Sequence, residues 1–395
     1  MIDTPQQLEN LIDRARQARR VALDTEFVWE RTYYAGLGLV QLGLSRDEVY
    51  LIDTVAIDDL SALGALIADP DVVKILHDAQ QDLMILYRAT GGAPRSIFDT
   101  RLAGGFVGLT ATTSLQALIG ATVDVHLPKG ESRSDWLRRP LREAQLEYAR
   151  DDVRYLPDAF DVLWARIDAL DRRAWVEEEM AQYDDLSLYT EDDPFERYRS
   201  VKGRGKRGFS PLDYAVLREL TAWREQEARH RDRPRGHIVK DDVLVTLAQR
   251  KPTNDGALRD VQGVSDNAVR NYGDAIVEAV KRGLDVPKSD RPKPTRRRRK
   301  DDTEIARFDL AQALIKGRSL SHEIDPGLIG NRASVERLVA AGPGADPAEH
   351  PVLRGWRREF VGEAVLDLLR GEGSVSVDPE TDLPRLVPNS EQTPS

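Results

Sequence analysis

Short apolar segments alternate with helical periodicity over the first 170 residues of this chain, whereas the later segments show helical periodicity alone. Five segments have the length and apolar content of strands: 21–27 (VALDTEF), 37–45, 48–53, 72–76 and 96–100. Apolar spacing predicts helices over 5–19, 57–69 and 78–90, and the turn-like residues 45–47 indicate an antiparallel meander. Because strands that alternate with helices build layered domains, we expect an α/β domain whose sheet is covered by helices.

The length of 395 residues exceeds one ordinary core and predicts two or three domains. The small, basic stretch 201–208 and the Pro-containing, basic stretch 289–302 have the composition of linkers. We therefore predict five regions: an α/β domain at 1–200, a helical domain at 209–288, a basic linker at 289–302, a second helical domain at 303–373 and a disordered tail at 374–395.

Two compositional absences exclude whole classes of protein. The chain has no cysteine, which excludes disulfides, iron–sulfur clusters and thiolate zinc sites. No apolar run approaches the roughly 18 to 20 residues that span a bilayer, and the N-terminus lacks the pattern of a secretory signal. We expect a protein of the cytoplasm with no membrane partner.

The charge is unevenly distributed along the chain. The net charge is −10, yet residues 201–300 hold 25 Lys and Arg against 14 Asp and Glu, a net charge of +11. Since association with phosphates depends on the local field, the acidic total does not exclude a nucleic-acid partner.

Asp24 and Glu26 lie two residues apart on the first predicted strand. A strand has a period of two, so both side chains point to the same face. Two carboxylates beside the apolar run 21–23 repel each other unless a cation lies between them, and hard oxygen ligands suit Mg²⁺ or Mn²⁺. The alternative is an edge strand with solvated acids, which is the better interpretation for such a pair taken alone.

Three further acidic or tyrosine residues indicate a functional site only when their motifs are taken together. Tyr148 and Asp152 have i, i+4 spacing on one helical face, a pair that also arises by chance, and Asp82 alone fits a solvated helix face. Taken in order, DTEF at 24–27, the H-x₄-D spacing from His77 to Asp82 and the Y-x₃-D spacing of Tyr148 and Asp152 are far more specific.

With these three motifs the chain resembles the DEDD exonuclease superfamily, in the branch with a tyrosine in the third motif. The segments DTEFVWERTYYAGLGLVQL, HLPKGESRSDWLRRPL (126–141) and EYARDDVRYL resemble the ribonuclease D family. The resemblance covers essentially the whole chain, and residues 209–283 are similar to the helicase-and-ribonuclease-D C-terminal (HRDC) domain. It implies a ribonuclease H-like α/β domain with a mixed sheet, followed by two small all-α domains.

The resemblance also implies an activity and a set of roles. The enzyme would be a 3′→5′ exoribonuclease that uses two divalent ions, Mg²⁺ or Mn²⁺, and releases nucleoside 5′-monophosphates. Asp24 would bridge both ions, Glu26 and Asp152 would complete the site of the ion that activates water, and Asp82 would hold the second ion. Tyr148 would orient the attacking water, because a phenol with a pKa near 10 is a poor base at pH 7.

The expected substrates are the 3′ ends of transfer-RNA precursors and other small structured RNAs, bound by a monomer. Two other functions remain open at this point: a DNA repair exonuclease, which would use the same metals, and an inactive exonuclease fold that binds RNA. The intact set of five residues argues against the inactive module, and the ribonuclease D-like segments favour RNA over DNA.

Several other residues have two interpretations each. Lys129, Arg133 and Trp136 lie in a loop that could bring cations and an aromatic ring to an RNA 3′ end, or Trp136 could pack in the core. His77 could be a base but fits better as a residue that caps or packs its helix. Asp151 is expected to be solvated.

Two basic features could bind phosphates. Arginines of the HRDC-like region could bind phosphates or be solvated; they are Arg218, Arg224, Arg229, Arg231, Arg233 and Arg235. The run 296–300 (RRRRK) could add phosphate affinity or serve as a spacer.

Overall fold

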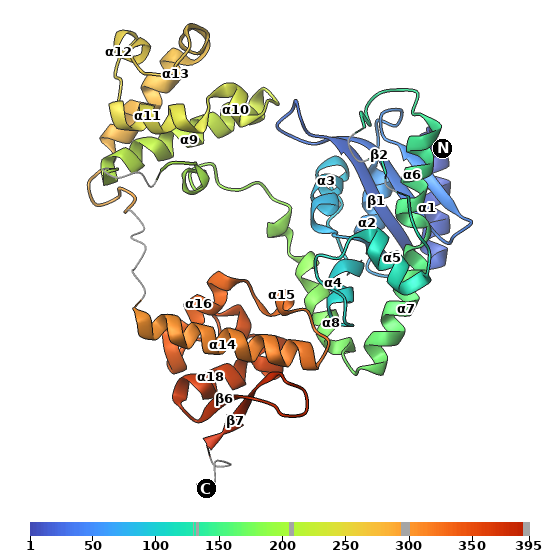
Figure 1. Ribbon diagram of the computed structural model, residues 1–395. Coiled ribbons are helices and arrows are strands. Elements are labelled where there is room, and N and C mark those ends of the chain that lie inside the picture. The colour runs from blue at the N-terminus through green and yellow to red at the C-terminus, as the bar shows by residue number, and fades with distance from the viewer. Residues whose placement is uncertain (129, 132–133, 205–208, 294–300, 390–395) are drawn as a thin grey trace. The chain divides into compact units, whose positions relative to one another are not determined.

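The computed structural model describes residues 1–128, 130–131, 134–204, 209–293 and 301–389 (Figure 1). The chain divides into two compact units. The first unit comprises residues 1–26, 37–189 and 299–395, and the second comprises 27–36 and 190–298. Among the residues that the structure describes, no helix is long and apolar enough to cross a membrane.

A mixed five-stranded sheet forms the centre of the first unit. Its strands are β1 (Arg20–Val28), β2 (Gly36–Gly43), β3 (Val49–Asp53), β4 (Val73–Leu76) and β5 (Ile97–Asp99). Their order in the sheet is β3-β2-β1-β4-β5; β4 is parallel to β1 and β5, and β2 is antiparallel to β3. All five strands predicted from the sequence are confirmed, as is the mixed sheet.

Helices cover this sheet (Figure 1). They are α1 (Pro5–Ala18), α2 (Ser61–Ile67), α3 (Gln80–Thr90), α4 (Thr100–Gly105), α5 (Leu115–Val123), α6 (Glu143–Arg154), α7 (Leu156–Ala169), α8 (Arg173–Met180) and the 3₁₀ turns η1 (Ala181–Asp184) and η2 (Leu186–Leu188). Val21, Ala22 and Leu23 follow one another on β1 and all are buried. Since successive strand residues point to opposite faces, both faces of β1 must be covered.

The C-terminal part of the first unit is mainly helical. Its elements are α14 (Asp302–Ser321), α15 (Pro326–Ile329), α16 (Arg332–Ala341), η4 (Gly342–Gly344), η5 (Pro351–Leu353), α17 (Gly355–Arg357), the π-helical η6 (Arg358–Gly362) and α18 (Glu363–Arg370). Its helices share one continuous hydrophobic core with the α/β domain.

The prediction of a disordered tail at 374–395 is wrong over most of that range. The strands β6 (Gly373–Val377) and β7 (Pro384–Pro388) form an antiparallel pair there. Val375 and Leu386 face each other in this hairpin, and both pack against the hydrophobic core. The apolar burial of these two side chains orders a segment whose overall composition is polar, so this part of the chain is not purely helical.

Two adjacent glutamates of α8 bind the C-terminal part. The Glu178 carboxylate accepts a hydrogen bond from the backbone N–H of Trp356 at 3.1 Å. Glu179 accepts from the indole N–H of Trp356 at 3.0 Å and from the Arg357 guanidinium at 2.8 Å. Trp356 is only 1% exposed and its indole bond to Glu179 is buried, whereas Glu178 is exposed and binds the Trp356 backbone from the edge of the shared core.

The second unit contains the predicted HRDC-like helices. They are η3 (Arg197–Ser200), α9 (Pro211–His230), α10 (Arg235–Ile238), α11 (Asp241–Arg250), α12 (Asp255–Arg259) and α13 (Asp266–Asp285). Ser210 begins α9 with a capping box: its hydroxyl accepts from the N–H of Asp213, whose carboxylate accepts from the N–H of Ser210. These helices build their own hydrophobic core.

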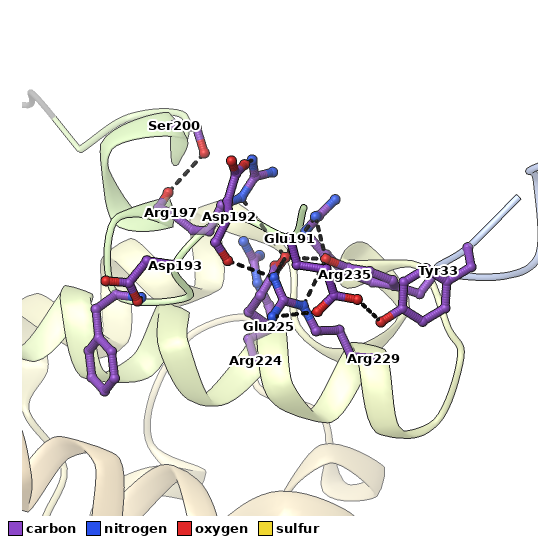
Figure 2. A network of polar contacts seen from close by, with 12 residues as sticks. Tyr33, Glu191, Asp192, Asp193, Arg197, Ser200, Arg224, Glu225, Arg229 and Arg235 are labelled. Atoms are coloured by element: carbon purple, nitrogen blue, oxygen red, sulfur yellow. Dashed lines mark hydrogen bonds and ion pairs between the residues drawn. The ribbon is translucent and has the colours of Figure 1, made fainter. Parts of the chain in front are cut away.

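Residues 27–36, which follow β1 in sequence, also belong to the second unit. Figure 2 shows how Tyr33 of this segment meets α9 and α10. The Tyr33 hydroxyl donates a hydrogen bond to Glu225, whose side chain is 1% exposed. Arg235 donates to Glu225 at 2.5 and 2.8 Å and to the Tyr33 hydroxyl at 2.9 Å, while Arg229 donates to that hydroxyl at 3.2 Å.

Candidate active site

Three predicted site residues meet at the end of β1. Oxygen atoms of Asp24, Glu26 and Asp152 all lie within 4.8 Å of one another. Asp24 and Glu26 come from the same face of β1, as the period of two predicts, and Asp152 comes from the last turn of α6. Residues more than 120 positions apart in sequence thus form one acidic cluster.

Asp82 joins this cluster from a third element. It lies in the first turn of α3 and is 9% exposed. Its carboxylate accepts a hydrogen bond from the hydroxyl of Thr25, the residue between the two acids of β1. The repulsion between Asp82 and the other three carboxylates is strong enough to raise their pKa values, so all four belong to one electrostatic site.

Burial and mutual repulsion make these carboxyl groups unusually hard to ionise. Burial, followed by repulsion from Asp82, Asp152 and Glu26, raises the pKa of Asp24 well above its ordinary value. Burial and repulsion by Asp152 and Asp82 raise the pKa of Glu26 to about 9. Burial raises the pKa of Asp82 and that of Asp152 to about 7, although hydrogen bonds from Thr25 and Tyr148 act in the opposite direction.

This donor set fits a divalent cation. Four carboxylates supply hard oxygen ligands of the kind that Mg²⁺ and Mn²⁺ prefer. A cation among them would remove the repulsion that raises their pKa values, and the carboxylates are too buried for water to screen that repulsion fully.

Tyr148 adjoins the cluster on α6, one turn before Asp152. Its hydroxyl hydrogen-bonds the Asp152 carboxylate, and burial together with the nearby carboxylates raises the pKa of the phenol above its ordinary value. The group therefore stays protonated at neutral pH and can donate a hydrogen bond. It cannot act as a base there.

The predicted RNA-binding loop is described only in part. Lys129 and Arg133 lie outside the described residues. Trp136 is buried, with 1% of its surface exposed, and its ring centroid lies 6.2 Å from that of Tyr148. Trp136 therefore packs in the core, which was one of its two predicted interpretations. Stacking of this ring on an RNA base would require the loop to open.

A glycine of the same loop lies against the Tyr148 ring. A Cβ atom added to Gly130 would come within 1.6 Å of a Tyr148 ring carbon. Only glycine fits so close to the ring, and its small size allows the loop to pack over Tyr148. Trp136 and Gly130 together restrict the orientation of the phenol.

The other acidic and histidine candidates have structural partners. The two ring nitrogens of His77 hydrogen-bond Thr100 and the carbonyl oxygen of Thr113, each at 3.0 Å, and burial lowers the pKa of the imidazole. Both ring nitrogens of His77 are thus occupied by structural hydrogen bonds, which agrees with the prediction that His77 caps or packs its helix and is not a base. Asp151 pairs with Arg154 at 2.6 Å and is partly buried, so it is less solvated than expected.

Most of the HRDC-region arginines hold the second unit together. Arg224 is 4% exposed and pairs with Asp241 at 2.8 Å. Arg229 and Arg235 pair with Glu225, and Arg231 pairs with Glu227. These four guanidinium groups form ion pairs with carboxylates of the same unit, which weakens the hypothesis that they bind phosphates. The run 296–300 lies outside the described residues.

Comparisons with known proteins agree with this site and with the helical region that follows. A family model described as a 3′-5′ exonuclease matches residues 1–168, and a model described as the HRDC domain matches residues 213–280. The chain is 39% identical over 361 residues to the ribonuclease D of Desulfotalea psychrophila, covering 91% of this chain and 96% of that protein. The chain belongs to the ribonuclease D family.

Other members of the ribonuclease D family support the assignment over the same length. The protein from Pseudomonas paraeruginosa is 38% identical over 350 residues, which cover 88% of this chain and 92% of that one. The crystal structure of Escherichia coli RNase D, described as an exoribonuclease involved in structured RNA processing, matches with a TM-score of 0.82 and 29% identity. That match covers 94% of this chain and 98% of the other.

Membership of the ribonuclease D family confirms the resemblance, the fold class and the activity predicted from the sequence. The chain is a 3′→5′ exoribonuclease whose substrate is RNA. Its acidic cluster fits the divalent metal ions on which the DEDD family depends. Sequence reasoning had named the acidic residues of this cluster, but it missed Thr25 and Gly130, since neither carries a charge or a motif of its own.

Proposed function

We propose that Asp24, Glu26, Asp82, Asp152 and Tyr148 are the catalytic residues and that the four carboxylates hold two divalent ions, Mg²⁺ or Mn²⁺. The observation that carries the proposal is the approach of Asp24, Glu26 and Asp152 oxygens to within 4.8 Å of one another. Asp24 would contact both ions, Glu26 and Asp152 would complete one ion site, and Asp82 would complete the other.

Each residue contributes a defined part of the chemistry. Two bound divalent ions would supply a water nucleophile near neutral pH and neutralise charge on the phosphate that is attacked. Tyr148 keeps its proton and orients that water by hydrogen bonding. Thr25 holds the Asp82 carboxylate in place. Breakage of the last phosphodiester bond releases a nucleoside 5′-monophosphate and leaves an RNA shorter by one residue.

We also propose a substrate class and an oligomeric state. The E. coli relative is described as acting in structured RNA processing, and this chain matches it over nearly its whole length. We infer that this enzyme is a monomer that trims the 3′ ends of transfer-RNA precursors and other small structured RNAs. Trimming of a precursor with a 3′ trailer down to its folded stem would support this substrate class, and indifference to the stem would contradict it.

The number of ions can be measured directly. Metal-free protein is titrated with Mn²⁺, and free Mn²⁺ is followed by electron paramagnetic resonance. We expect two bound ions per chain in the presence of a hydrolysis-resistant RNA, and one in the Asp82→Asn variant. One ion in both proteins would contradict the two-ion assignment.

A further inference from the structure

The turn that precedes α3 has a conformation that its own sequence does not favour. Asp78 has a φ of 64°, in the left-handed region that residues other than glycine rarely adopt. The N-cap position of α3 is Ala79, whose side chain cannot cap a helix. A strained backbone of this kind persists only where its surroundings hold it, and such strain is concentrated at functional sites.

Asp99, from the end of β5, holds this turn. Its carboxylate is 1% exposed and accepts hydrogen bonds from the backbone N–H groups of Asp78 at 3.1 Å and Ala79 at 3.0 Å. The same carboxylate caps α4 by accepting from the N–H of Arg101 at 2.9 Å. Asp99 thus joins the starts of two helices.

Tyr183 of η1 provides the fourth hydrogen bond to Asp99 among the described residues. Its buried hydroxyl donates to the carboxylate at 2.6 Å. Tyr183 is itself held, because its carbonyl oxygen accepts from the Tyr189 hydroxyl at 2.7 Å. The Tyr183 hydroxyl therefore fixes the orientation of a carboxylate that the turn depends on.

The turn at Asp78 determines where α3 begins and hence where Asp82 lies. Asp82 is in the first turn of α3, four residues beyond Asp78. A rotation at the strained turn would move the whole first turn of the helix and displace the Asp82 oxygens from the other three carboxylates. Misplacement of a reacting group by about 1 Å can cost on the order of 100-fold in rate.

We infer that Asp99 is a positioning residue that keeps Asp82 in place for divalent ion binding, and that Tyr183 orients Asp99 for this task. The inference rests on the proposed role of Asp82 as a metal ligand. Asp99 does not touch the acidic cluster itself; it acts through the turn at Asp78 and the start of α3. Its task is that of an outer group which fixes a ligand in a metal site.

The chemistry of the four hydrogen bonds explains why a carboxylate is required. One oxygen accepts from Asp78 and Arg101, and the other accepts from Ala79 and Tyr183. An ionised carboxylate is acceptor-only at both oxygens, whereas asparagine has an NH₂ group at one position. In Asp99→Asn that NH₂ group must face at least one backbone N–H donor, so the turn loses one of its hydrogen bonds.

The test measures Mn²⁺ binding by calorimetry to full-length, metal-free protein, with turnover as a second readout. Asp99→Asn should raise the Mn²⁺ midpoint by about 10- to 100-fold, and excess Mn²⁺ should restore most of the turnover. Tyr183→Phe keeps the ring and removes one hydrogen bond, so its midpoint should rise by about two- to tenfold with little change in Tm.

Asp325→Asn is the matched control. Asp325 also accepts backbone hydrogen bonds at the start of a helix, from Ala111 and Gly327, in the same unit but on another element. This variant should lower Tm and leave the Mn²⁺ midpoint unchanged, because a purely structural cap does not act on the ligand.

The variant Asp82→Asn distinguishes a failure of the positioning inference from a failure of the proposed function. If Asp82→Asn weakens Mn²⁺ binding but Asp99→Asn and Tyr183→Phe bind as the wild type does, the positioning inference is wrong and the proposed function stands. If Asp82→Asn itself leaves binding unchanged, the assignment of Asp82 and the inference built on it both fail. Should Asp99→Asn not fold, the midpoint of Tyr183→Phe decides.

Discussion

The hydroxyl of Thr25 donates a hydrogen bond to the carboxylate of Asp82. This bond joins β1, which carries Asp24 and Glu26, to α3. Thr25 and Asp82 are both buried, at 5% and 9% exposed. The bond favours the ionised form of Asp82, since it lowers a pKa that burial raises. Metal binding needs that ionised form, so a neutral hydroxyl contributes to the site without being a ligand.

Thr25→Val should therefore weaken metal binding without disturbing the fold. Valine has nearly the same shape as threonine and lacks the donor, and a hydrogen bond to a charged group contributes about 1.5–3 kcal/mol, or at least tenfold in affinity. Calorimetric titration with Mn²⁺ would measure the change. Thr25→Ser, which keeps the hydroxyl, should bind as the wild type does; equal losses in both variants would contradict this role.

The stability of the metal-free protein should fall as pH rises. The carboxyl groups have folded pKa values of about 7 for Asp82 and Asp152 and about 9 for Glu26, all raised above the unfolded value near 4. A raised folded pKa stabilises the protein below the unfolded pKa, and that contribution is lost as pH rises through the folded pKa. The loss should extend from about pH 4 to 9.

Divalent ions should reverse this loss. The rise in Tm on adding Mg²⁺ should grow between about pH 6 and 9, because the ions compete with protons for the same oxygens. Glu26→Gln replaces a carboxyl that must take up a proton to fold at pH 8 by an amide that does not ionise, so its metal-free Tm at pH 8 should exceed that of the wild type. Its turnover should fall by about 100-fold or more. A rise in Tm that is independent of pH would show that these carboxylates do not bind the ions.

Tyr148→Phe should lower kcat and leave KM and Tm nearly unchanged. The phenylalanine ring keeps the packing against Trp136 and Gly130 and removes only the hydroxyl that bonds Asp152. Loss of an orienting group should reduce kcat by about 100-fold. Single-turnover rates on a short RNA would measure this, and a kcat within twofold of the wild type would contradict the role of Tyr148.

Glu225 should be essential to the second unit, where it lies between Tyr33, Arg229 and Arg235 (Figure 2). Glu225→Ala removes the buried acceptor of the Tyr33 and Arg235 hydrogen bonds, at a cost of about 3–5 kcal/mol. Amide exchange of α9 in the full chain should then speed up by about 100-fold or more, at tenfold per 1.4 kcal/mol.

The matched control for Glu225 is Glu278→Ala, which breaks an exposed pair with Lys281. Because both side chains are exposed to solvent, this pair contributes little to stability, so exchange should change little. Similar exchange rates in the two variants would contradict the importance of the buried network.

Period two on β1 and i, i+4 spacing on α6 place pairs of side chains by local geometry, but only the resemblance to the DEDD exonucleases predicted that the four carboxylates form one site. The sequence was insufficient for contacts that depend on tertiary packing. Tyr183 and Asp99 are 84 residues apart, and Tyr33 and Glu225 are 192 apart, so no local pattern links them. The β6–β7 hairpin was not predicted, because the burial of its apolar residues depends on the helices against which it packs.

The most direct test of the central claim is a time course on a 5′-labelled RNA with an unpaired 3′ tail. The reaction is run with Mg²⁺ or Mn²⁺, with EDTA, with a matched DNA strand and with Asp24→Asn. We expect a metal-dependent ladder that shortens from the 3′ end, faster on RNA than on DNA and absent with EDTA or Asp24→Asn. Near-wild-type shortening by Asp24→Asn, or binding without any shortening in either metal, would contradict the account.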